Sequence, residues 1–165
     1  MYLFTVVGHT GQGKSTWTKK FVNNTNHYVF DVNNEYGYLP DDNVLRPQMR
    51  NTTLNMATFI KNAAMLNGTN IVFEDATGFL RGRQSEDFAR LLIGKRHTKN
   101  NYILLFHSVN RVPPEIMEMT NFLILFKTID NVRLVDQKFG NDIITNAVEE
   151  LKQRPQFSFK QIRLI

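Results

Sequence analysis

The sequence predicts an α/β fold in which helices flank a central, mostly parallel sheet. Three observations favour this class. Short apolar runs alternate with helix-like stretches along most of the chain. These runs are continuous, which is typical of strands buried on both faces of a sheet. The first run passes directly into a glycine-rich loop and then into a helix-like segment, so the chain opens with a strand–loop–helix unit.

Each expected helix has a local signal. The first begins in the glycine loop, and the second has helical apolar spacing followed by Gly68 near its end. Ser85 is expected to cap the third helix, whose first turn is acidic. A fourth, short helix starts with proline. The expected helices are residues 14–24, 54–66, 85–97, 113–119 and 141–154, and the expected strands are residues 2–7, 27–32, 71–76, 101–108 and 121–128.

Two segments depart from this alternation. Residues 36–53 contain glycine and proline and are expected to form a long loop. Residues 157–165 alternate apolar and polar side chains, which favours an edge strand on the sheet. Because 165 residues fit one domain, we expect residues 1–165 to form a single domain.

Composition restricts the class of protein. The chain is 42% hydrophobic, enough for a packed core, and its lack of cysteine excludes disulfides and thiolate metal sites. We expect neither a transmembrane segment nor a signal peptide, since no apolar run is long enough and the first residues lack a basic start. The net charge of +5 raises the chance of a polyanionic partner, although a basic protein without such a partner explains it equally well.

The segment VVGHTGQGKST, residues 6–16, carries the motif G-x-x-x-x-G-K-[ST] between the first strand and the first helix. In such a loop the backbone amides surround phosphate oxygens, and the helix N-terminus adds its dipole. Lys14 is expected to reach the β- and γ-phosphates, and Ser15 to ligate Mg²⁺. We therefore predict a site for ATP with magnesium. Its predicted nucleotide-binding residues are Gly8, His9, Thr10, Gly11, Gln12, Gly13, Lys14, Ser15 and Thr16.

Polar residues also end the third and fourth strands. Glu74 and Asp75 follow an apolar run, where buried carboxylates are costly unless a cation or a donor pairs with them. We assign Glu74 to the metal and Asp75 to the attacking water, by their order along the strand. At the tip of the next strand, His107 or Ser108 is expected to face the γ-phosphate.

Four stretches resemble the HerA/FtsK superfamily of ATPases in their order and rough spacing. They are GHTGQGKST, FDVNNEYG, IVFEDA and KRHTKNNYILLFHSVNRVPPEI, so the resemblance extends to about Asp130. Within the superfamily, the chain looks like the small genome-packaging ATPases of icosahedral viruses. It is also similar to the ATPase part of filamentous-phage assembly proteins that resemble zonula occludens toxin. The resemblance implies a RecA-like sheet of order 5-1-4-3-2 and a ring that moves DNA.

The resemblance also bears on single residues. The acidic pair is Glu-Asp where Asp-Glu is usual, and His107 stands where glutamine is common. An acidic residue after the second strand faces the nucleotide or the water in these ATPases. Glu35, in the motif D-x-x-x-E-Y that begins at Asp31, is therefore a second candidate for water activation. An arginine acting on the neighbouring subunit is also implied. Its candidates are Arg81, Arg83, Arg96 and Arg111, with Arg83 and Arg96 ranked first.

The expected function is ATP-driven DNA translocation, as a viral genome-packaging ATPase. A phage assembly or secretion ATPase shares all the motifs and stays an alternative. A P-loop small-molecule kinase is a weaker alternative, because we find no clear lid segment. The expected partners are the backbone of double-stranded DNA, further copies of the chain in a pentameric or hexameric ring, and a capsid-vertex or membrane protein. The expected location is the virion or the host cytoplasm.

Overall fold

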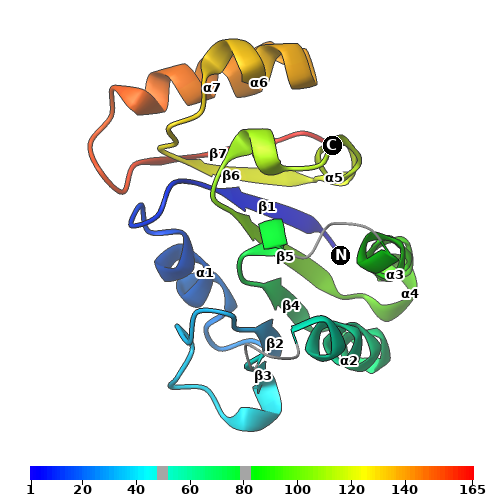
Figure 1. The fold of residues 1–165 in the computed structure, drawn as a ribbon. Helices are drawn as coiled ribbons and strands as arrows, with labels where there is room; N and C mark the ends of the chain where they lie inside the picture. Colours follow the sequence, from blue (N-terminus) through cyan, green and yellow to red (C-terminus); the bar gives the residue numbers. More distant parts are fainter. Residues whose placement is uncertain (48–51, 79–82) are drawn as a thin grey trace.

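The computed structural model describes residues 1–47, 52–78 and 83–165. Its centre is a seven-stranded sheet of order β3-β2-β4-β5-β1-β6-β7 (Figure 1). Neighbouring strands are parallel throughout, except that β7 runs antiparallel to β6. The strands are β1 (Leu3–Val7), β2 (His27–Phe30), β3 (Val44–Leu45), β4 (Asn70–Phe73), β5 (Asn101–Phe106), β6 (Phe122–Phe126) and β7 (Phe159–Arg163).

The five strands expected from the apolar runs are β1, β2, β4, β5 and β6, and they stand in the predicted order 5-1-4-3-2. Two further strands extend the sheet at its edges. β7 is the predicted C-terminal edge strand, paired with β6. β3 lies in residues 36–53, which we expected to be loop; at two residues, it is too short to show an apolar pattern. The α/β fold class is confirmed.

The helices connect these strands. They are α1 (Lys14–Val22), α2 (Thr52–Met65), α3 (Arg83–Ile93), α4 (Lys95–Thr98), α5 (Pro114–Met119), α6 (Val132–Phe139) and α7 (Asp142–Lys152). The single helix expected over residues 85–97 is divided at Gly94 into α3 and α4. Since α3 begins at Arg83, Ser85 lies inside the helix, and its predicted role as the cap is wrong. Among the described helices, none is long and apolar enough to cross a membrane.

The two faces of the sheet carry different layers. Alternate residues of each strand point to opposite faces, so Phe4 and Val6 pack with Val22 of α1, whereas Leu3 and Val7 belong to the core that includes α2, α3, α5, α6 and α7. Figure 1 shows α1 on one side of the sheet, with α2, α3 and α4 on the other. Thus α1 is the one described α-helix in its layer, and it leaves the β6–β7 edge of that face partly open.

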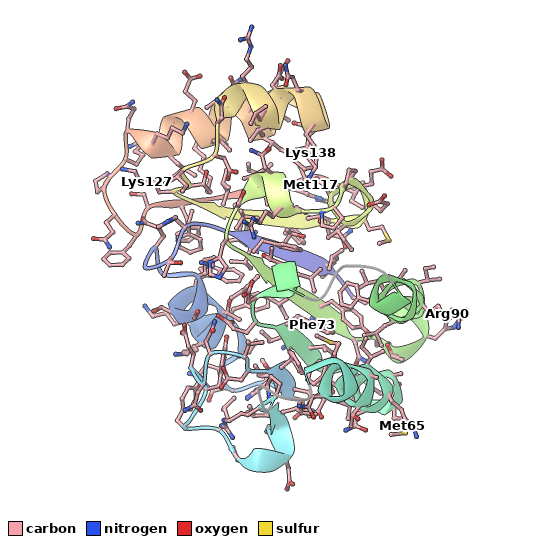
Figure 2. All side chains as sticks on the ribbon, in the orientation of Figure 1. Met65, Phe73, Arg90, Met117, Lys127 and Lys138 are labelled. Carbon is pink, nitrogen blue, oxygen red and sulfur yellow. The ribbon has the colours of Figure 1, made fainter. Side chains whose placement is uncertain are left out.

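An aromatic cluster joins the middle of the sheet to two helices. Phe73 of β4 meets the ring of Phe59 from α2 at 5.1 Å and that of Phe88 from α3 at 4.8 Å, both edge to face. Figure 2 shows Phe73 directed toward this helical layer. Edge-to-face pairs of buried rings stabilise a core beyond the burial of their area. The cluster fixes the end of β4, from which Glu74 and Asp75 extend.

Candidate active site

The glycine loop joins β1 to α1 at the carboxyl edge of the sheet. Gly8 lies so close to β6 that a β-carbon there would be 2.6 Å from the Cβ of Phe126. Gly13 has a φ of 96°, a left-handed conformation that glycine adopts without strain. Helix α1 then begins at Lys14, and the first N–H groups of a helix have no partner within it. The loop is therefore built to hold an anion at a helix N-terminus.

Backbone hydrogen bonds hold the loop against the sheet. The amide of Gly8 donates to the carbonyl of Phe106 at 3.1 Å, and that of His9 to the carbonyl of Lys127 at 3.0 Å. The amide of Gln12 donates back to the carbonyl of His9 at 3.3 Å. Three of the predicted nucleotide-binding residues thus shape the loop through their main chain, and they tie it to the ends of β5 and β6.

Lys14 lies at the base of this loop and is buried. Its Nζ donates to the carbonyl of His9 at 3.3 Å and is 3.4 Å from Nδ1 of His107. Burial lowers the pKa of Lys14, while the carboxylates of Glu74 and Glu35 oppose that effect. A desolvated ammonium of this kind gains stability from a negatively charged ligand.

Glu74, at the end of β4, is the most buried carboxylate facing the loop, with 3% of its surface exposed. Ser15 Oγ donates to its Oε1 at 2.8 Å, and the hydroxyl of Tyr36 donates to its Oε2 at 3.4 Å. Burial raises the pKa of Glu74 to about 7, although the Ser15 hydrogen bond works against the rise. The site therefore holds a carboxylate that a cation would stabilise.

The donor set suits Mg²⁺. Ser15 and Glu74 offer a hydroxyl and a carboxylate oxygen already within hydrogen-bond distance of each other. Mg²⁺ is usually held by one or two protein oxygens, with phosphates and water completing its shell. Among the described residues no group of three or more His, Cys, Asp or Glu side chains could hold a metal by itself.

Asp75 follows Glu74 with a φ of 51°, in the left-handed region that Asp tolerates better than most residues. Its Oδ1 is 3.7 Å from Nε2 of His107 and has no hydrogen-bond partner although it is buried. Burial, and next the ammonium of Lys14, lower the pKa of His107. The lowered pKa favours the neutral form of the imidazole, although the carboxylate of Asp75 opposes that effect.

The segment after β2 forms a second acidic wall. Asp31 is buried and accepts hydrogen bonds from the amides of Glu35 and Tyr36, both at 2.9 Å. Arg46 lies 3.7 Å from Asp31 and donates to the carbonyl of Tyr36 at 3.0 Å. Asp31 thus builds the turn, while Glu35 lines the site and pairs with Lys19 at 3.7 Å. Of the two acidic residues expected here, Glu35 is the one that faces the loop.

Several of these groups line a cavity of about 440 Å³, whereas Asp75 is not among the described residues that line it. It brings together residues from the glycine loop, the segment after β2, the ends of β4 and β5, and the segment before β7. They are Thr10, Gly11, Gly13, Lys14, Ser15, Thr16, Asn33, Glu35, Glu74, His107 and Phe157. The cavity therefore combines the backbone of the glycine loop with the carboxylates of Glu35 and Glu74, an arrangement suited to a metal-bound phosphate chain.

Of the four expected arginines, the structure describes the side chain of Arg111 alone. Arg81 lies outside the described residues, and so do the side chains of Arg83 and Arg96, although their backbones begin α3 and lie in α4. Arg111 is exposed after β5 and adds to the lowering of the pKa of His107. Among the described side chains that line the cavity, none is an arginine.

The structure also places side chains that sequence reasoning missed or placed differently. The hydroxyl of Ser108, a candidate for the γ-phosphate, donates instead to Asp130, which also accepts from the amides of Val109 and Asn110. Asp130 therefore holds the loop that follows His107. No spacing signal marked it, because it comes from the far end of β6. Tyr36 is part of the motif D-x-x-x-E-Y. The motif does not show that the segment after β2 folds back toward β4, where the Tyr36 hydroxyl donates a hydrogen bond to Glu74.

The whole fold is similar to that of solved viral packaging proteins. The DNA-packaging ATPase B204 from Sulfolobus turreted icosahedral virus aligns with a TM-score of 0.76 and 16% identity, over 99% of this chain and 98% of that one. The genome-packaging NTPase B204 from Sulfolobus turreted icosahedral virus 2, in complex with ATP-gammaS, aligns with a TM-score of 0.75 and 17% identity, over 98% of this chain and 91% of that one. At such identities the likeness shows a shared fold.

The sulfate complex of the same virus 2 protein aligns with a TM-score of 0.77 and 16% identity, over 98% of this chain and 91% of that one. No family model matches the sequence. No curated protein matches it either.

Proposed function

We propose that this chain hydrolyses ATP as the motor subunit that translocates DNA during viral genome packaging. The observation that carries the proposal is the cluster of Lys14, Ser15 and Glu74 in one cavity at the carboxyl edge of the sheet. The likeness to packaging NTPases over nearly the full length of both chains supports the same function. The place of the chain within the HerA/FtsK superfamily is part of this proposal.

The residues divide the work of phosphoryl transfer. The loop amides and the Lys14 ammonium hold the β- and γ-phosphates. Ser15 and Glu74 would hold Mg²⁺, and the bound ion would neutralise negative charge on the phosphates. Asp75, beside His107, accepts the proton of the attacking water as the γ-phosphorus bond to the bridging oxygen breaks. Glu35 is the alternative base, because its side chain lines the cavity next to the loop, whereas Asp75 reaches the site through its contact with His107.

A neighbouring subunit completes the site. The charge that spreads over the γ-phosphate in the transition state is met in such enzymes by an arginine. Following the resemblance, we assign this role to Arg83 or Arg96 of the adjacent copy. A ring of five or six copies brings these groups together. The ring grips the DNA backbone through phosphate contacts that do not depend on sequence, and a capsid-vertex or membrane protein anchors it.

The motor proposal is tested by measuring ATP hydrolysis with and without double-stranded DNA, alongside the mass of the protein in solution. We expect DNA to raise the rate, the rate per subunit to increase with protein concentration, and salt to weaken the DNA effect. Single-stranded RNA serves as the comparison polymer. A strictly monomeric protein that hydrolyses ATP at a rate indifferent to DNA would contradict the motor, while leaving the nucleotide site in place.

Mixing two inactive proteins tests the shared site. One carries Lys14→Ala and the other carries Arg83→Ala with Arg96→Ala. A mixed ring places an intact loop beside intact arginines, so part of the activity should return. If the mixture co-assembles and stays inactive, the arginine does not come from the neighbour.

A further inference from the structure

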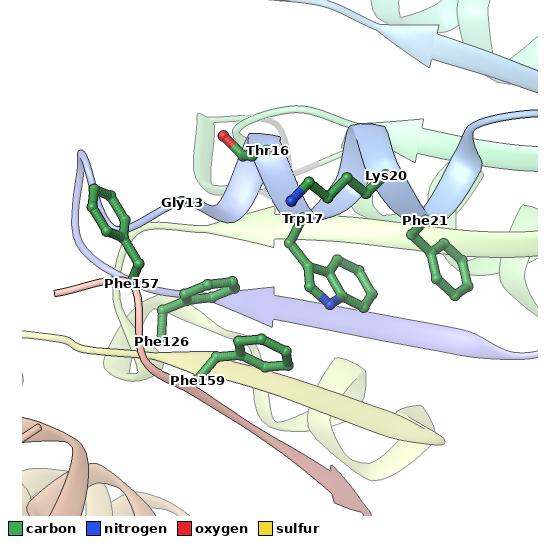
Figure 3. Close-up of a pocket in the computed structure, with 8 residues that line it drawn as sticks. All are labelled: Gly13, Thr16, Trp17, Lys20, Phe21, Phe126, Phe157 and Phe159. Atoms are coloured by element: carbon green, nitrogen blue, oxygen red, sulfur yellow. The ribbon is translucent and has the colours of Figure 1, made fainter. Parts of the chain in front are cut away.

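A second cavity, of about 730 Å³, opens beside the glycine loop. It lies between α1 and the β6–β7 edge of the sheet, on the face that α1 leaves partly uncovered (Figure 3). Its walls are rich in aromatic rings. They include Trp17 and Phe21 of α1, Phe126 of β6, Phe157 before β7 and Phe159 at its start, beside Thr16 and Lys20.

This aromatic cavity is continuous with the site described above. Gly13, Thr16 and Phe157 line both cavities. A nucleotide anchored by its β- and γ-phosphates in the loop has to extend its ribose and base away from Lys14. The aromatic cavity begins where the first turn of α1 passes Thr16 and Trp17, at the end of the loop away from Glu74 and His107. One elongated ligand can therefore occupy both cavities.

The rings of the cavity are held in place by their neighbours. Trp17 stacks on Phe21 at 5.0 Å, and Phe126 meets Phe159 at 5.2 Å in a tilted pair. Figure 3 shows Trp17 on the α1 side, with Phe126 and Phe159 on the sheet side. Fixed aromatic faces on opposite walls favour a flat aromatic ligand, because offset stacking stabilises such contacts.

The chain segment before β7 closes the cavity next to the loop. Gln156 Nε2 donates to the carbonyl of Gly11 at 3.2 Å, and Lys127 Nζ donates to the carbonyl of Arg154 at 3.3 Å. Phe157 adopts a φ of 67°, uncommon for a residue with a bulky side chain, and 61% of the residue's surface is exposed. An exposed ring held in a strained conformation at the mouth of a ligand site points to a role for the ring itself.

We propose that the aromatic cavity binds the nucleobase, that Phe157 is a stacking residue for it, and that stacking area sets base preference. The proposal rests on the nucleotide site of the proposed function. Reading one base requires both donors and acceptors matched to its edge. Among the described lining side chains, Thr16 is the one that offers an acceptor, while Trp17 and Lys20 only donate. With a single side-chain acceptor and otherwise mostly aromatic walls, the cavity offers too few polar groups to match the edge of one base, so it prefers purines to pyrimidines by stacking area and separates adenine from guanine poorly.

Trp17 is the single tryptophan of the chain, so its fluorescence reports the aromatic cavity directly. The full chain is titrated in Mg²⁺ with non-hydrolysable analogues of ATP, GTP, CTP and UTP, and with inorganic tripolyphosphate. Calorimetry measures binding of the same ligands. We expect all of them to bind, and only those with a base to quench Trp17. The purine analogues should bind about tenfold more tightly than the pyrimidine ones, and ATP and GTP analogues within about threefold of each other.

The test variant is Phe157→Gly, since glycine adopts the left-handed conformation without strain and the fold is preserved. It should weaken nucleotide binding about tenfold and leave tripolyphosphate binding unchanged. Tyr2→Ala removes a partly exposed ring at the opposite end of β1 and should change neither.

Three results would overturn the proposal. They are an equal loss of tripolyphosphate and nucleotide binding in Phe157→Gly, a preference above about a hundredfold for one base, and Trp17 fluorescence that changes with protein concentration alone. The last result would assign the cavity to contact with a second copy. If neither tripolyphosphate nor nucleotides bind, the phosphate site itself fails, and the proposed function fails with it. Tripolyphosphate binding without any effect of the base overturns only the present inference.

Discussion

Replacing Glu74 by glutamine should stabilise the ligand-free protein while removing its response to magnesium. Burial raises the pKa of Glu74 from 4.5 to about 7. Because the folded pKa lies above the unfolded value, the associated stability is complete below about pH 4.5 and is lost as the pH rises through 7. Above pH 7 the cost of holding the charged carboxylate is roughly 3 kcal/mol.

Glutamine keeps the local contacts of the protonated acid. Its carbonyl accepts from Ser15, and its amide donates to the hydroxyl of Tyr36. Thermal unfolding at pH 8 should therefore show Glu74→Gln melting above wild type by roughly 6–12 °C, with little difference at pH 5. The same variant should bind ATP equally with and without Mg²⁺. Glu149→Gln, an exposed carboxylate on α7, is the matched control and should show no such change.

A melting difference of the same size at pH 5 and pH 8 would show that Glu74→Gln acts through packing and not through the charge of Glu74. Melting of Glu74→Gln below wild type at pH 8 would equally contradict the prediction. Either result would mean that burial does not raise the pKa of Glu74, and that groups of the protein already stabilise its charge without a metal.

The remaining predictions concern the base and the loop. Asp75→Asn should bind ATP yet slow hydrolysis about 10²–10⁴-fold; if Glu35→Gln is the slow variant and Asp75→Asn is active, the base is Glu35. Gly8→Ala should cost about 1–3 kcal/mol in urea unfolding, because its β-carbon would lie 2.6 Å from that of Phe126. Gly78→Ala, where a β-carbon meets nothing within 4 Å, is its control, and equal losses in the two would show that contact with β6 does not matter.

The sequence predicted local structure better than it predicted contacts between residues that are far apart in the chain. The strand–loop–helix unit around Lys14 is local, so its motif predicted its conformation. The order of the five strands followed from the resemblance, and the sheet confirms it. β3 was missed, because two residues paired at a sheet edge carry no periodicity.

The site was predictable where its residues end strands, and less so where loops fold back. The sequence placed Glu74 and His107 at the carboxyl edge because parallel strands end together. It did not show that Asp130 would cross from β6 to hold the loop after β5, nor that Gln156 would reach Gly11. Both contacts join residues distant in the chain, and their side chains are of ordinary types, so no spacing rule identifies them.

The measurement that tests the central claim most directly is Mg²⁺-dependent ATP hydrolysis by purified Lys14→Ala beside wild type. Lys61→Ala, an exposed lysine on α2, serves as the control for loss of a positive charge. We predict that wild type and Lys61→Ala hydrolyse ATP and that Lys14→Ala does not, with all three giving the same circular dichroism and cooperative melting. Full hydrolysis by folded Lys14→Ala would contradict the claim that this loop and its buried lysine form the ATP site.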